Sequence, residues 1–224
     1  MSGYFGLIIA SAAFVGSHFV MSHPFRKQMV RMFGKNGFMG VYSLIVFGFF
    51  AMMVVAFRSA PNAEALWPSG DLLWAFSSFL TLMAAVLFTG SLIGNPSLPS
   101  SAAADLAMRQ PSGVFKVTRH PMMWSFALWG AAHILIAPRT ATLIFIGSII
   151  FLALVGARAQ ERKKSNIMGV EWEMWLRRTR FFPQMSGFFR VPILNWIIGA
   201  SLWLVATWVH GFFAVPAAGL FRWI

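Results

Sequence analysis

Long apolar runs, separated by short polar and basic segments, form the dominant pattern along this chain. Each run is close to the roughly 20 residues that an α-helix needs to cross the hydrocarbon core of a bilayer. We therefore predict an all-α, polytopic membrane helical bundle that forms one domain over residues 1–224. The six predicted transmembrane helices lie at residues 4–21, 37–57, 72–93, 121–137, 140–157 and 193–215.

The composition excludes a soluble globular protein. Hydrophobic residues make up 58% of the chain and charged residues 11%, whereas soluble domains carry about 25% charged residues. Cysteine is absent, which excludes disulfides, thiolate metal sites and cysteine nucleophiles. Any metal ligand or nucleophile must therefore be another type of side chain.

The basic residues alternate between the two ends of the predicted helices. All but three of the 18 Lys and Arg residues lie in the connections after the first, third and fifth runs, and the exceptions are Arg58, Arg139 and Arg222. Because cytoplasmic loops are rich in Lys and Arg, these connections should face the cytoplasm and both termini the other side. We expect a multi-pass protein of a bacterial inner membrane. Its net charge of +12 then indicates contact with anionic lipid headgroups and not with nucleic acid.

Five histidines are the candidates for chemistry within the membrane. Ionisable residues at membrane depth are costly and usually functional, and neutral imidazole is the commonest metal ligand. The topology puts His18, His23 and His120 toward the cytoplasmic side and His133 and His210 toward the other side. Two histidines from different helices suit a bis-histidine haem. The alternative is that each histidine makes only a hydrogen bond between helices.

The segment Arg119-His120-Pro121 is a second candidate site. Proline is favourable at the first position of a helix, so the segment predicts a helix that starts at Pro121. Arg119 favours an anionic partner, and its charge favours the neutral form of the neighbouring imidazole. We expect Arg119 and His120 to act together as catalytic residues near His18. The alternative is that the segment is only a helix start.

Acidic residues gather in the connection between the fifth and sixth runs. Glu161, Glu171 and Glu173 lie there among many basic residues, which they either neutralise or join in a cofactor site. Trp172 and Trp175 have the character of interfacial anchors.

Three segments resemble the NnrU family: GSHFVMSHPFR at 16–26, Asn95-Pro96, and TRHPMMWSFALWGAAH at 118–133. That family, named from denitrification gene clusters, is similar to the 15-cis-zeta-carotene isomerases of plants and cyanobacteria. The resemblance implies haem b held by histidines and, in the isomerase branch, cis-to-trans isomerisation of a polyene, an apolar small-molecule substrate. His18 and His133 fall where the haem ligands would be, and His23, Arg119 and Glu161 are further candidates for cofactor binding.

Other features of this resemblance bear on the chemistry. The isomerases have a cysteine where this chain has Gly130, so a ligand exchange with a thiolate is excluded. We expect the substrate in an apolar cavity lined by Trp124, Phe126 and Trp129. A non-enzymatic alternative is an accessory factor that carries haem or helps assemble nitrite or nitric oxide reductases.

A looser similarity links the chain to the isoprenylcysteine carboxyl methyltransferases. It rests on Arg119-His120-Pro121, Glu161, the segment GVEWEMW at 169–175, and Phe182-Pro183. It implies that His120 and Glu161 bind S-adenosylmethionine. Trp172 and Trp175 stand where tyrosines are usual in that family. A membrane methyltransferase is therefore the alternative to the haem protein.

Overall fold

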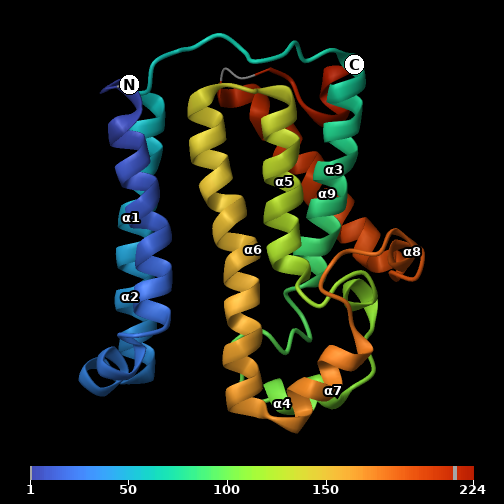
Figure 1. Cartoon of the computed structure of the whole chain (residues 1–224). Helices are drawn as coiled ribbons and strands as arrows, with labels where there is room; N and C mark the ends of the chain where they lie inside the picture. Colours follow the sequence, from blue (N-terminus) through green and yellow to red (C-terminus); the bar gives the residue numbers. More distant parts are fainter. Residues whose placement is uncertain (1, 214–215) are drawn as a thin grey trace. The chain divides into compact units, whose positions relative to one another are not determined.

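The protein folds into helices joined by turns and short loops. The computed structural model describes residues 2–213 and 216–224, in which no strand occurs. Six apolar helices make up most of this part of the chain (Figure 1): α1 (Phe5–Ser22), α2 (Arg26–Arg58), α3 (Asp71–Gly90), α5 (Pro121–Ile136), α6 (Thr140–Met168) and α9 (Ile193–His210). Five of them are long and apolar enough to cross a membrane, and α5 is shorter. The chain is thus a multi-pass membrane protein, and the predicted fold class is confirmed.

Short helices occupy the polar connections between the apolar ones. Each predicted span corresponds to one apolar helix, although residues 214–215 at the end of the sixth lie outside the described part of the chain. The short elements are η1 (Ser2–Tyr4), α4 (Ala103–Met108), η2 (Gly113–Lys116), α7 (Val170–Arg178), α8 (Met185–Phe188), η3 (Gly211–Phe213) and η4 (Gly219–Arg222).

Two of the apolar helices are longer than their predicted spans. Helix α2 begins at Arg26, within the first basic connection, and its helical conformation is interrupted at Gly34, where φ is +70°. Helix α6 continues through the basic segment to Met168, because residues such as Ala, Arg, Gln, Glu and Lys favour a helix. It ends at Met168, and the following Gly169 adopts a positive φ of 58°, which glycine tolerates better than other residues. Glu161 therefore lies on a helix and not, as predicted, in a loop.

The chain divides into two compact units, and unit 1 consists of Met1–Pro68 and Ala137–Leu152. Here α1 packs on α2, and the Phe57 and Phe145 rings of α2 and α6 are 4.8 Å apart. The loop before α3 is tied to the start of α6, because Leu66 N–H donates to the Pro138 carbonyl at 2.8 Å.

Unit 2 consists of Ser69–Ile136 and Ala153–Ile224. Helix α3 packs against both α5 and α9, which run beside it in Figure 1. Ser77 Oγ of α3 donates to the Ala132 carbonyl of α5 at 3.2 Å. Helices α3 and α9 approach closely at Gly199, where an added Cβ would lie 2.6 Å from the Cα of Val86. Small residues permit such close contacts between membrane helices.

Helix α7 packs into the core of unit 2. Trp172 is fully buried and Trp175 is 2% exposed, and the Trp175 ring is 5.5 Å from that of Phe115. The prediction that these tryptophans are interfacial anchors is therefore wrong. The two are three residues apart, so they lie on one face of α7. That face packs on the buried cluster of unit 2.

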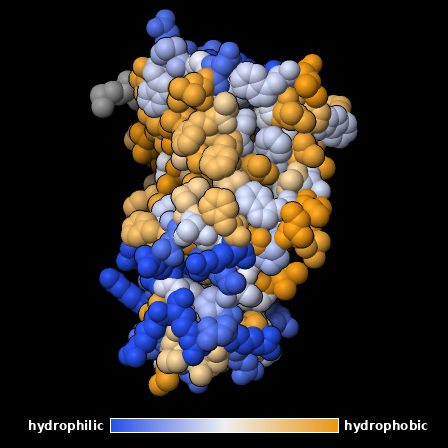
Figure 2. Space-filling view, turned by 90° about the vertical axis from the view of Figure 1, so that its right-hand side faces the viewer, coloured by the Kyte–Doolittle hydropathy of each residue, from blue (hydrophilic) through white to orange (hydrophobic). Residues whose placement is uncertain are grey.

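The surface of unit 2 separates apolar from hydrophilic residues. Figure 2 shows hydrophobic residues over the helical part of this face and a hydrophilic band at the end that carries α7. Several large apolar side chains of α9 are exposed, among them Ile193, Ile197, Val205 and Trp208. Such a continuous apolar surface is unusual for a soluble protein and fits a bilayer as the surrounding solvent.

Candidate functional sites

The segment before α5 is held by pairing with a distant segment that follows α7. Arg119 N–H donates to the Arg180 carbonyl at 2.8 Å, and Thr118 Oγ donates to the Phe181 carbonyl at 2.6 Å. Helix α5 then starts at Pro121, so the predicted helix start is confirmed. These contacts fix the direction in which the Arg119 and His120 side chains leave the backbone.

Arg119 and His120 converge on one carboxylate oxygen. Arg119 Nε donates to Glu161 Oε1 at 2.5 Å, and His120 Nε2 lies 3.1 Å from the same oxygen. The Arg119 guanidinium also donates through Nη1 to the carbonyls of Thr179, at 2.9 Å, and Leu176, at 3.3 Å. The anionic partner of Arg119 in the structure is therefore Glu161, which the methyltransferase resemblance had placed with His120 at a cofactor site.

The contact with Glu161 fixes the tautomer of His120. A carboxylate only accepts, so Nε2 carries the proton and Nδ1 carries a lone pair. The His120 side chain is 1% exposed, and its Nδ1 has no hydrogen-bond partner. Burial lowers the pKa of His120 below its ordinary value, the charges of Arg119 and Arg158 act in the same direction, and Glu161 opposes them. The imidazole is therefore neutral at pH 7, with a free nitrogen lone pair.

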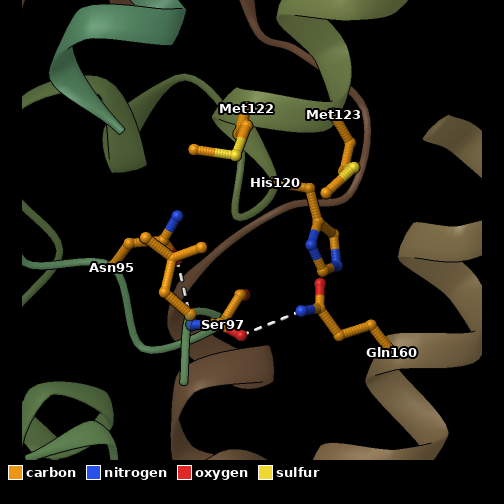
Figure 3. A pocket seen from close by; sticks show the side chains of 7 residues that line it. Asn95, Ser97, His120, Met122, Met123 and Gln160 are labelled. Carbon is orange, nitrogen blue, oxygen red and sulfur yellow. Dashed lines mark hydrogen bonds between the residues drawn. The ribbon is translucent and has the colours of Figure 1, made fainter. Parts of the chain in front are cut away.

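A small hollow lies beside this imidazole. Figure 3 shows its lining residues, which come from the loop after α3, the start of α5 and the polar part of α6: Asn95, Ser97, Leu98, His120, Met122, Met123 and Gln160. Gln160 Nε2 donates to the Ser97 carbonyl at 2.8 Å. Lys164 Nζ donates to the Pro96 carbonyl at 2.7 Å. Both side chains of α6 therefore hold the loop that closes the hollow.

Two of the remaining histidines lie next to each other within unit 2. His133 of α5 and His210 of α9 have ring centroids 6.3 Å apart, with 33° between the ring planes. Each Nδ1 donates to the carbonyl four residues earlier, His133 to Trp129 and His210 to Ala206, both at 2.8 Å. The Nε2 atoms consequently carry the lone pairs. Metal-binding histidines commonly have this arrangement, in which a backbone carbonyl fixes the ring.

The other two histidines belong to unit 1. His18 Nδ1 donates to the Phe14 carbonyl at 2.8 Å, and its ring packs against those of Phe14 and Tyr42. His23 is exposed, and its Nδ1 lies 2.9 Å from Ser22 Oγ. His120 and His133 belong to unit 2. The predicted pairing of His18 with His133 would join residues of different units and stays a prediction. The same holds for the inner site of His18, His23 and His120.

The aromatic residues expected around a substrate contact different neighbours. Trp124 Nε1 donates to the Phe181 carbonyl at 2.8 Å, Phe126 packs on Phe88, and the Trp129 ring is 4.4 Å from that of His133. Of the three, Trp129 is therefore next to a candidate ligand. Within the described part of the chain, no group of three or more His, Asp or Glu side chains could hold a metal ion.

Sequence reasoning missed Gln160, Lys164 and the two methionines of the hollow. A signal was present for the first two, because Gln160 and Lys164 are four residues apart and flank Glu161. This spacing puts them on one face if the segment is helical. The segment was assigned to a loop because its charges mark the end of the apolar run. For Met122 and Met123 the sequence gives no comparable signal.

Comparison with known proteins agrees with the resemblance seen in the sequence. Searches of curated proteins and of solved structures found no match. The family model described as NnrU protein matches residues 6–217, nearly the whole chain. The matched range includes all five histidines and Glu161. The chain thus belongs to the NnrU family.

Proposed function

We propose that this NnrU-family protein binds haem b and that His133 would be one of the residues that hold its iron. The observation that carries the proposal is the pair of imidazoles from α5 and α9. His133 and His210 both donate from Nδ1 to a backbone carbonyl, so both present an Nε2 lone pair. Paired histidines on facing helices are a common way to hold a cofactor inside a helical bundle.

The two rings lie close together: their centroids are 6.3 Å apart, with 33° between the ring planes. If the haem lies between α5 and α9, His133 and His210 would hold its iron through their Nε2 atoms, which the Nδ1 contacts leave free. Trp129, whose ring is 4.4 Å from that of His133, supplies an apolar flat surface nearby.

Two histidines are candidates for the second residue that would hold the iron. Within unit 2 the geometry favours His210, whose ring is the one near His133. The family resemblance favours His18, whose Nδ1 is likewise held by a carbonyl, that of Phe14. Both have the same free Nε2, so spectra of variants must distinguish them.

We propose further that the haem protein isomerises a double bond of an apolar polyene. Haem iron supplies a Lewis acid or a one-electron donor when it is bound. The chain's own residues orient the substrate and exclude water, and the exposed apolar surface of α9 offers access from the hydrocarbon layer. The family resemblance supports this activity, and the site is expected in the membrane of a bacterium.

The hollow beside His120 argues against the methyltransferase alternative. Pockets for ligands of drug-like size measure about 300 to 1,000 Å³. The hollow encloses only about 10 Å³, roughly the space that one water molecule needs, which is too small for S-adenosylmethionine. A ligand at His120 is therefore expected to be smaller.

Absorbance of the purified protein tests haem binding. The full chain should show a Soret band, and His133→Ala should remove it or strongly reduce the haem-to-protein ratio. Either His210→Ala or His18→Ala should also change the band, and the variant that does so identifies the second ligand. His23→Ala is the matched control, because His23 is exposed.

The possible outcomes separate the rival functions. A colourless protein from haem-replete cells that binds S-adenosylmethionine in calorimetry would favour the methyltransferase. A haem protein that leaves the isomer ratio of added cis-polyenes unchanged would favour the accessory role in assembly of nitrogen-oxide reductases. Monodispersity in detergent should be recorded for every variant, so that loss of haem is not confused with loss of fold.

A further inference from the structure

The hollow beside His120 contains a buried nitrogen lone pair that the protein does not use. The His120 side chain is 1% exposed. Its Nε2 donates to Glu161, and its Nδ1 has no hydrogen-bond partner. Buried polar atoms nearly always have a partner in native proteins. The lone pair therefore points to a ligand that accepts electrons or donates a proton.

Two of the other donor atoms at this hollow are soft thioether sulfurs. Met122 and Met123 from the first turn of α5 line it together with His120. In Figure 3 the Met123 thioether lies nearer the imidazole, and the Met122 side chain is directed away from it. Asn95 is already engaged, since its Nδ2 donates to the Ser91 carbonyl and its Oδ1 accepts from Ser97 N–H. The available set is thus one imidazole nitrogen, two thioether sulfurs and the Ser97 hydroxyl, which is also buried without a hydrogen-bond partner. Thioether ligands select Cu(I) among biological metal ions.

The charges around the hollow discriminate against divalent ions. Glu161 is shared by Arg119 and His120. The Arg158 guanidinium lies over the Phe181 ring, 3.8 Å from its centre, and its charge acts on His120. Lys164 binds the Pro96 and Leu98 carbonyls of the loop that closes the hollow. Repulsion from these positive charges scales with the charge of the bound ion, so a divalent ion is disfavoured about twice as strongly as a monovalent one.

We propose that this hollow is a Cu(I) site formed by His120 Nδ1 and the thioethers of Met122 and Met123. The size of the hollow fits an ion better than an organic ligand. The Glu161 contact holds the imidazole in the tautomer that presents Nδ1. Gln160 and Lys164 of α6 hold the loop across the opening. The site is separate from His133 and His210 and does not depend on haem binding.

Metal titration of the purified full chain tests this site. Cu(I) is added without oxygen, in the presence of ascorbate and of bathocuproine disulfonate as a coloured competitor. The wild-type chain should bind one equivalent. Met122→Leu/Met123→Leu should weaken this binding at least tenfold, because leucine has no sulfur. Leucine also conserves the volume of methionine, so the fold should be retained.

A matched control removes two other methionines from unit 2. Met108 and Met185 are exposed and do not line the hollow, and Met108→Leu/Met185→Leu should bind Cu(I) as the wild type does. Equal binding by both double variants would overturn the proposal, as would wild-type binding no stronger than that of the Met122→Leu/Met123→Leu chain. A tenfold excess of Zn(II) should not displace Cu(I), and displacement would contradict the charge argument.

A spectroscopic readout locates the ion without relying on affinity. Ag(I) has the same charge as Cu(I) and also prefers thioethers, and it is not oxidised during the measurement. On addition of Ag(I), the ¹³C methyl resonances of Met122 and Met123 should shift before those of the other methionines. Shifts confined to other methionines would overturn the assignment. The haem spectrum of the same samples should stay constant, which separates this result from that of the haem experiment.

Discussion

His120 donates its Nε2 proton to Glu161 over 3.1 Å, although 41 positions separate the two residues in the sequence. This contact connects the start of α5 with the polar part of α6. It orients the imidazole and at the same time occupies a carboxylate that Arg119 also needs. The three side chains therefore form one unit of structure, and removing any member should affect the others.

Removal of Glu161 should destabilise the protein. In Glu161→Ala the largely buried Arg119, 14% exposed, loses its charged partner, which should cost about 2 kcal/mol. Thermal unfolding in detergent measures the effect, and Glu173→Ala on the exposed face of α7 is the control. In a double-mutant cycle, Arg119→Ala and Glu161→Ala should be non-additive by about 0.5–3 kcal/mol. Additive losses would show that the pair does not act together.

The stability of the chelator-treated protein should depend on pH through His120. Because the pKa of His120 is lowered from 6.5 in the folded chain, the unfolded chain binds more protons below pH 6.5. Stability should therefore be complete above that pH and decrease as the pH falls, by up to about 1.4 kcal/mol per pH unit, until the folded imidazole also titrates. His120→Gln should decrease less between pH 7 and 5. Parallel pH profiles of the two proteins would contradict this.

Cysteine labelling should place the two ends of the helices on opposite sides of the membrane. The chain has no cysteine, so single introduced thiols report without background. Asn62→Cys should react with an impermeant reagent in intact cells, and Ser165→Cys only after permeabilisation, because the basic connections are expected inside. Ser100→Cys, in the connection between α3 and α5, should behave as Ser165→Cys does. Labelling of Asn62→Cys and Ser165→Cys from the same side would overturn the predicted topology.

A methyl group at the contact between α3 and α9 should destabilise unit 2. In Gly199→Ala the new Cβ would lie 2.6 Å from Val86 Cα, so the helices must separate, at a cost of about 1–3 kcal/mol. Gly147→Ala on α6 is the matched control, because no atom lies within 4 Å of its added Cβ. Thermal unfolding of both variants checks the prediction. A Gly199→Ala chain as stable as Gly147→Ala would mean that the contact adapts without strain.

The sequence predicted the spans better than it predicted the contacts between connections. Apolar runs identify membrane helices because lipid requires apolar side chains over a fixed length, and all six runs correspond to helices. Outside the bilayer this constraint is absent. The polar end of α6 was therefore assigned to a loop, although its residues favour a helix. The direct contact between His120 and Glu161 was not predicted for this reason, although the methyltransferase resemblance had placed both residues at one cofactor site.

Tertiary contacts also decided the environment of the tryptophans. Trp172 and Trp175 were expected at the lipid interface because tryptophan is common there. In the structure they face Phe115 and the rest of the buried cluster, since α7 turns this face inward. No pattern in the short segment at 169–175 distinguishes these two environments. For the histidines, by contrast, depth along the spans was informative, because His133 and His210 lie together.

The attachment of the loop at 95–98 to α6 has a mechanical consequence. Gln160, Glu161 and Lys164 lie within about one turn of a single helix. They hold the loop and the His120 imidazole at the same time. A rotation of this part of α6 about its own axis would strain all of these contacts together. A change in the position of this helix end would therefore act on the loop and on the imidazole together.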